Sequence, residues 1–182
     1  HLTILKGIDE RFETPFYNAL VSYSKRPTGV FHAMPISRGN SIFKSNWIRE
    51  MGDFYGRNIF LAETSATTGG LDSLLQPTGP LKKAQEMASR AFGSRRSFFV
   101  TNGTSTANKI VVQALVQPGD VILIDRDCHK SHHYGLVLSG AKPVYLDSYH
   151  LEQYSMYGAI PLKLIKDQLH TFKKAGRLDE VK

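Results

Sequence analysis

The chain has 182 residues, a length typical of about one domain, and 41% of them are hydrophobic. This composition excludes disordered, collagen-like and low-complexity chains and is typical of a folded domain with its own core. The longest apolar runs, such as residues 121–124, are too short to cross a bilayer, and the first residues lack the pattern of a signal peptide. Together with the single cysteine, Cys128, these features predict a cytoplasmic protein that binds no membrane.

The net charge is +7, from 23 lysines and arginines against 16 aspartates and glutamates. An excess of this size raises the question of nucleic acid as a partner. The basic residues are scattered in ones and twos, however, and no motif of a nucleic-acid-binding domain accompanies them. We therefore expect no nucleic-acid partner, while the charge is compatible with an anionic small molecule.

The chain divides into two regions that differ in the regularity of their hydrophobic pattern. Residues 1–56 form an irregular lead-in with one short amphipathic stretch at Phe16–Tyr23 and a passage rich in proline and glycine. In residues 57–182 the spacing of the apolar residues alternates between that of helices and that of strands. The predicted elements, in chain order, are a helix from Pro80 to near Gly93, a strand at 97–101, a helix through 107–115, a strand at 121–124, a helix at 130–139, a strand at 143–146 and a helix through 162–172. This order predicts an α/β fold with a mostly parallel sheet and helices on both faces.

Two loops at the predicted strand ends carry unusual residues, and in open α/β sheets ligands bind at such ends. The first reads T-N-G-T-S-T-A-N at residues 101–108. Its Gly103, Thr104 and Ser105 stand where a strand turns into a helix, so free N–H groups and hydroxyls could converge on a phosphate. The simpler alternative is that Thr104 or Ser105 only caps the helix. The loop is neither a Walker A motif nor G-x-G-x-x-G, which disfavours nucleotides.

The second loop reads D-R-D-C-H-K-S-H-H at residues 125–133. Its cysteine and histidines suggest a metal, but no glutamate stands between the histidines and no third ligand is signalled, so we expect no metal site. An imidazole that packs against a ring is an equally natural role for a histidine here. For His132 and His133 the preferred interpretation is that they cap or flank a helix, and Lys130 is expected to be solvated.

These two loops, together with L-D-S-L-L-Q-P-T-G-P and S-G-A-K-P-V-Y-L, resemble the major domain of the pyridoxal-phosphate-dependent ornithine, lysine and arginine decarboxylases. The resemblance spans roughly residues 54–146 and implies the aspartate-aminotransferase-like fold, with residues 57–182 as the first half of the cofactor-binding domain. It also implies that Gly103, Thr104 and Ser105 bind the phosphate of pyridoxal 5'-phosphate and that His129 stacks on its ring. Residues 60–79 would lie near the interface of a homodimer or higher homo-oligomer with shared active sites.

The implied reaction is decarboxylation of arginine, lysine or ornithine to the amine, as in polyamine biosynthesis. Two features depart from the family: H-A-M-P-I-S-R-G-N replaces a proline-glycine-histidine loop, and neither the later S-x-H-K lysine nor the aspartate that pairs with the pyridine nitrogen occurs. We therefore expect the native chain to continue past residue 182 and this piece alone to be inactive. An aminotransferase or other lyase of the same fold and a non-catalytic phosphate-binding module remain alternatives. Glu63 is a weak candidate to bind the distal amine of the substrate.

Overall fold

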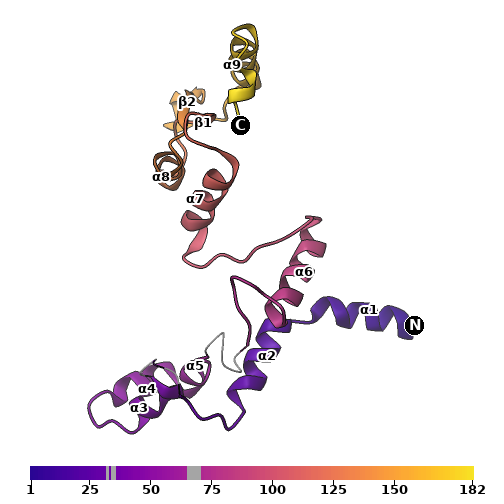
Figure 1. Cartoon of the computed structure of the whole chain (residues 1–182), viewed down its shortest axis with the longest axis vertical. Coiled ribbons are helices and arrows are strands. Elements are labelled where there is room, and N and C mark those ends of the chain that lie inside the picture. Colours follow the sequence, from indigo (N-terminus) through magenta and orange to yellow (C-terminus); the bar gives the residue numbers. More distant parts are fainter. Residues whose placement is uncertain (32, 34–35, 65–70) are drawn as a thin grey trace. The chain divides into compact units, whose positions relative to one another are not determined.

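The computed structural model describes residues 1–31, 33, 36–64 and 71–182 (Figure 1). The chain forms two compact units, residues 1–99 and residues 100–182. Within the described ranges, no helix is long and apolar enough to span a bilayer. The predicted domain boundary after residue 56 stays a prediction.

The first unit is helical. Its elements are α1 (Leu2–Phe12), α2 (Pro15–Ser24), the short 3₁₀ helix η1 (Ser37–Gly39), α3 (Asn40–Phe43), α4 (Arg49–Tyr55), α5 (Arg57–Leu61) and α6 (Pro80–Phe92). Helix α6 confirms the sequence prediction: Pro80 opens it and Gly93, with φ of +65°, ends it in the left-handed conformation. Helices α2 and α6 pack together, and α2 contains the predicted amphipathic stretch.

A buried arginine holds the middle of this unit together. The Arg38 side chain is only 7% exposed, and its guanidinium donates to the backbone carbonyls of Tyr23, Ser24 and Arg26 at 2.9 to 3.2 Å. It also lies 4.8 Å from the centre of the Tyr23 ring. The last carbonyls of a helix have no partner inside that helix, so this single side chain closes the C-terminus of α2.

The second unit contains the sheet. Its elements are α7 (Gly103–Leu115), β1 (Val121–Asp125), α8 (Lys130–Ser139), β2 (Lys142–Leu146), β3 (His150–Leu151), the 3₁₀ helix η2 (Glu152–Tyr154), β4 (Met156–Tyr157), α9 (Leu162–Lys174) and the 3₁₀ helix η3 (Leu178–Glu180). Strands β1 and β2 run parallel and are joined through α8. The helices and strands predicted at 107–115, 121–124, 130–139, 143–146 and 162–172 are confirmed.

The sheet is smaller than the sequence predicts. It has two parallel strands, extended by one parallel bridge between Val121 and Val181, and a separate two-residue hairpin of β3 and β4. The strand predicted at residues 97–101 is wrong, since these residues form no strand and the Phe98 side chain is 74% exposed. An apolar run becomes a buried strand only when a neighbouring strand offers its hydrogen bonds, and none of the described residues does so here. The broad parallel sheet with helices on both faces is therefore not seen.

Helices α7 and α8 pack closely against each other in the second unit. A Cβ at Gly135 of α8 would lie 2.9 Å from the Cβ of Val112 on α7, which is closer than the Cβ of a residue approaches a non-bonded atom. Gly135 and the next residue, Leu136, are both buried. The glycine thus lets the two helix backbones approach closely, and this contact fixes the two loops that precede the helices.

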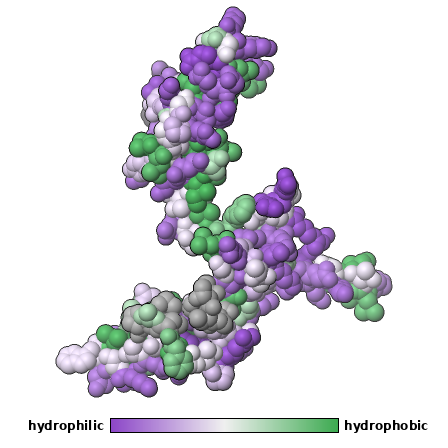
Figure 2. Space-filling model, in the orientation of Figure 1, coloured by the Kyte–Doolittle hydropathy of each residue, from purple (hydrophilic) through white to green (hydrophobic). Residues whose placement is uncertain are grey.

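Other faces of these helices carry exposed apolar side chains. Val137 of α8 is 80% exposed and Leu115 of α7 is 68% exposed. The space-filling view shows such hydrophobic patches on the surface of the chain (Figure 2). Exposed apolar area of this kind is typical of surfaces that contact further protein.

We predict that Gly135→Ala lowers the free energy of unfolding of the second unit by about 1 to 3 kcal/mol, because the added methyl overpacks the contact with Val112. Urea unfolding measures the change. Gly7→Ala in α1, where nothing lies within 4 Å of the added Cβ, is the control and gains only helix propensity. Recovery of stability in the double variant Gly135→Ala/Val112→Ala would support the contact. A free energy of unfolding in Gly135→Ala equal to that of the unsubstituted chain would contradict it.

Candidate functional site

The first predicted loop forms an open helix N-terminus. Helix α7 begins at Gly103, and its N-cap Asn102 has φ of +65° and makes no side-chain capping hydrogen bond. The interpretation that Thr104 or Ser105 caps the helix is therefore wrong, because both lie inside its first turn. Both residues are exposed, and no described residue accepts a hydrogen bond from their hydroxyls.

This geometry favours an anion. The first N–H groups of an α-helix have no partner within the helix, and the aligned peptide dipoles make this end positive. None of the described side chains uses these groups in α7. The Asn102–Gly103 turn has left-handed φ at both residues, and Gly103 brings no Cβ to crowd the approach. A phosphate could thus accept hydrogen bonds from the backbone and from the hydroxyls of Thr104 and Ser105.

The second predicted loop places His129 at the start of α8. His129 is the N-cap residue, and its Nδ1 accepts a hydrogen bond from the backbone N–H of Ser131 at 3.2 Å. The ring is exposed and therefore free to contact a ligand with its face. His132 and His133 lie inside α8 rather than at its cap, so the expected capping role belongs to His129 instead. Lys130 is exposed, as expected.

His133 forms a small polar cluster beneath the second loop. Its two ring nitrogens lie 3.4 Å from the Cys128 sulfur and 3.3 Å from the Tyr145 hydroxyl. Burial, followed by the negative charge of Asp125, raises the pKa of the Cys128 thiol above its ordinary value. The thiol is therefore protonated at neutral pH, which makes it a poor nucleophile or metal ligand. Across the described ranges, no group of three or more His, Cys, Asp or Glu side chains is arranged to hold a metal.

The carboxyl ends of β1 and β2 are acidic. A cavity of about 170 Å³ there is lined by Asp125, Asp127 and Asp147 among others. Arg126 neutralises only one of them, through an ion pair of 2.5 Å with Asp147. Carboxylates repel a phosphate, so this strand edge is less suited to an anion than the N-terminus of α7 is.

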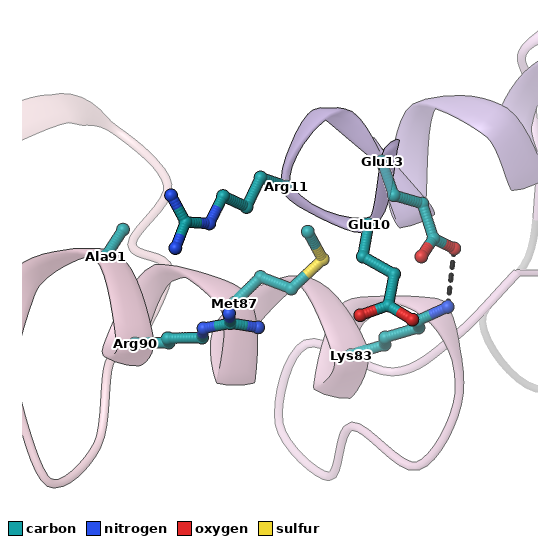
Figure 3. A pocket seen from close by; sticks show the side chains of 7 residues that line it. All are labelled: Glu10, Arg11, Glu13, Lys83, Met87, Arg90 and Ala91. Carbon is teal, nitrogen blue, oxygen red and sulfur yellow. Dashed lines mark hydrogen bonds and ion pairs between the residues drawn. The ribbon is translucent and has the colours of Figure 1, made fainter. Parts of the chain in front are cut away.

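A larger cavity lies in the first unit, between α1 and α6. Its volume is about 670 Å³, and Figure 3 shows its side chains, which are Glu10, Arg11, Glu13, Lys83, Met87, Arg90 and Ala91. Lys83 and Glu13 form an ion pair across it. The lining mixes both signs of charge and contains neither of the two predicted loops, so we assign it no ligand.

The motif L-D-S-L-L-Q-P-T-G-P is organised by one carboxylate. Asp72 accepts four backbone hydrogen bonds at 2.9 to 3.0 Å, from Ser73, Thr78, Gly79 and Leu81. Two of these donors belong to the start of α6, which has no cap from its own N-cap glycine. Asp72 therefore caps α6 from a distance, which gives this part of the motif a structural role that the sequence did not reveal.

Two other predicted segments are only partly described. Residues 65–70 of the expected interface segment 60–79, and His32, Met34 and Pro35 of the H-A-M-P loop, lie outside the described residues. Glu63 is half-buried, and its Oε2 accepts a hydrogen bond from the backbone N–H of Arg38.

Residues 14–176 match the family model described as Orn/Lys/Arg decarboxylase, major domain. The chain belongs to this family. Lysine decarboxylase LdcA of Pseudomonas aeruginosa is 38% identical over 85% of this chain and 20% of its own length. The constitutive ornithine decarboxylase of Escherichia coli is 39% identical over 77% of this chain and 20% of its own length.

A solved structure of a family member has a similar fold. The E. coli constitutive lysine decarboxylase superposes with a TM-score of 0.79 and 34% identity, over 93% of this chain and 24% of that chain. The chain thus spans about a fifth of the length of the curated relatives it matches. The expected family is confirmed, and the fold is a helix-rich α/β fold similar to lysine decarboxylase structures.

We predict that Asp72→Asn lowers the free energy of unfolding of the first unit by at least about 1 kcal/mol at neutral pH, because an amide cannot accept all four hydrogen bonds. Burial alone would raise the pKa of Asp72, but the four N–H donors outweigh it and hold the pKa below 3.8. The stabilisation is therefore complete above the unfolded-state pKa and is lost as pH falls through the lower folded-state value.

Unfolding in urea at several pH values between neutral and acidic measures this dependence. Asp53→Asn, at an exposed carboxylate of α4, is the matched control and should leave the stability at neutral pH unchanged. Equal stability of Asp72→Asn and the unsubstituted chain at neutral pH would contradict the capping role.

Proposed function

We propose that this chain supplies the phosphate-binding and ring-stacking part of a pyridoxal-phosphate-dependent decarboxylase that acts on arginine, lysine or ornithine. The observation that supports it most is the uncapped N-terminus of α7, with exposed Thr104 and Ser105 hydroxyls, on a helix packed against the helix that begins at His129. A helix start that only needed capping would have used one of these hydroxyls for itself.

The residues present suit this cofactor. The backbone N–H groups of Gly103, Thr104 and Ser105 and the two hydroxyls would hold its phosphate, and the positive end of α7 would favour the charge. The exposed imidazole of His129 would lie flat against the pyridine ring. When bound, pyridoxal phosphate supplies an electron sink for the electrons left on the substrate carbon when carbon dioxide departs.

The residues of this chain perform positioning. By holding the phosphate at one end and covering one ring face with His129, these residues would fix the orientation of the cofactor when it is bound. The imidazole also keeps water off that face. The amine that attaches the cofactor and the carboxylate that pairs with its ring nitrogen are not among the residues of this chain, and we do not assign either role to Lys130.

The identities to the relatives do not distinguish among the three amino acids, since a lysine decarboxylase and an ornithine decarboxylase are almost equally similar to this chain. Glu63 is less attractive as the partner of a substrate amine than the sequence suggested. One of its oxygens accepts the Arg38 N–H, and the other is buried without a partner among the described residues, out of reach of solvent. Its contacts indicate a role within its own unit.

We further propose that the protein acts as a homodimer or higher homo-oligomer. The apolar side chains that α7 and α8 expose support a surface that contacts more protein. The segment at residues 60–79, which the family resemblance places near the interface, would then contribute to the active site of the partner.

We predict that Ser105→Ala, in the protein expressed at its native length, weakens binding of pyridoxal phosphate by about 1 to 3 kcal/mol, the usual cost of losing a hydrogen bond to a charged group. Binding of pyridoxal, which lacks the phosphate, should not change. His129→Ala should weaken both compounds, because it removes the contact to the ring. Equilibrium titration by fluorescence measures all four affinities, and equal pyridoxal phosphate affinity in Ser105→Ala and the unsubstituted protein would contradict the phosphate site.

We also predict release of carbon dioxide from at least one of arginine, lysine and ornithine in the presence of pyridoxal phosphate. Labelled carboxyl groups on each amino acid measure the reaction directly. Transfer of the amino group without carbon dioxide release would identify an aminotransferase. Cofactor binding with no turnover of any of the three would contradict the decarboxylase proposal and favour a non-catalytic phosphate-binding module.

A further inference from the structure

We infer that Ser131 and Asn108 are positioning residues that fix the proton position and the orientation of His129 through a hydrogen-bond chain from α7 to α8. The purpose that we assign to this chain of hydrogen bonds, which is to present the ring of His129 to the cofactor, rests on the proposed function. The arrangement itself is a property of the protein without any ligand.

The chain of hydrogen bonds has one consistent direction. The Oγ of Ser131 lies 2.9 Å from the Nδ2 of Asn108 and 2.9 Å from the Nδ1 of His129. An amide nitrogen can only donate, so the Ser131 hydroxyl accepts from Asn108 and has its own proton left for His129. The backbone N–H of Ser131 donates to the same Nδ1 at 3.2 Å. Because Nδ1 receives two donors, the neutral ring carries its proton on Nε2.

Burial makes this chain difficult to replace. Ser131 is 1% exposed and is the most buried polar residue of the described chain, so water cannot take over its hydrogen bonds. A buried hydroxyl that lost either partner would pay a desolvation penalty. The His129 ring, by contrast, is exposed, and without the two donors it could rotate freely about its own side-chain bonds. The buried serine therefore restrains an exposed ring.

The same chain connects the two halves of the site. Asn108 stands four residues after Thr104 and three after Ser105, and residues at these separations share a face of a helix. The face of α7 that presents the two hydroxyls therefore also carries the amide that reaches Ser131. The close approach of the helices at Gly135 and Val112 sets the separation that this hydrogen bond spans.

The test is a comparison of Ser131→Ala with Ser139→Ala. Ser139 is a matched control because it is also a buried serine of α8, 8% exposed, but its hydroxyl donates to the Leu136 carbonyl at 3.2 Å and has no link to His129. Histidine labelled with ¹⁵N in the ring reports the tautomer in the protein at its native length without cofactor, above the pH range in which histidine titrates. The signal that His129→Gln removes identifies His129 among the histidines of the protein.

We expect the Nε2–H tautomer of His129 in the unsubstituted protein and in Ser139→Ala. In Ser131→Ala only the longer backbone N–H donor at 3.2 Å remains on Nδ1, so we expect a measurable fraction of the Nδ1–H tautomer beside the Nε2–H form. Asn108→Ala should shift the mixture in the same direction by less, because the Ser131 hydroxyl stays but is no longer oriented. If Ser131→Ala does not fold, Asn108→Ala provides the test instead, because Asn108 is only half-buried. An unchanged single tautomer in Ser131→Ala, or in Asn108→Ala where that is the variant that folds, would overturn the inference.

A second measurement separates this inference from the proposed function. Ser131→Ala should weaken binding of pyridoxal, which lacks the phosphate, by about threefold to tenfold, the equivalent of one ordinary hydrogen bond. The double variant Asn108→Ala/Ser131→Ala should bind pyridoxal no more weakly than Ser131→Ala does. Additive losses would overturn the idea that Asn108 acts through Ser131. If the tautomer shifts as expected but neither Ser131→Ala nor His129→Ala affects cofactor binding, the positioning chain stands and the proposed cofactor site fails.

Discussion

The contact between α7 and α8 is the constraint on which the candidate site depends. The missing side chain at Gly135 lets the backbones approach, and the hydrogen bond from Asn108 to Ser131 then crosses the gap between them. Each helix begins with one half of the site: α7 with free N–H groups and the hydroxyls of Thr104 and Ser105, and α8 with the ring of His129. Neither loop contains the other half, so the geometry of the pair is set by the packing of the helices behind them.

This arrangement separates positioning from covalent chemistry. An uncapped helix end and a restrained imidazole can bind a phosphate and cover a ring, but neither forms a bond to a substrate. The chain spans about a fifth of the length of its relatives, and the function we propose for it is the positioning half of the site. The exposed apolar side chains of α7 and α8 agree with a unit whose surface contacts more protein.

Much of the fold was predictable because its signals are local. Helix α6 has a proline at its start and a glycine at its end, and β1 and β2 are short apolar runs bounded by turn residues. The strand expected at residues 97–101 was wrong because pairing depends on a neighbour that the local sequence does not specify. Helix α1 was missed although Leu2, Leu5, Ile8 and Phe12 recur at near-helical spacing, a signal that a closer count would have found.

The sequence indicates the candidate residues of the site but not the connections between them. The two loops were recognisable from their glycine, hydroxyls and histidines, whereas the capping role of Asp72, the buried Arg38 and the Asn108–Ser131–His129 chain join residues that are distant in sequence. The most direct measurement is a crystal structure of the protein at its native length with pyridoxal phosphate. The account predicts a phosphate within hydrogen-bonding distance of the N–H groups of residues 103–105 and a ring stacked on His129. A cofactor phosphate bound elsewhere, with the start of α7 empty, would contradict it.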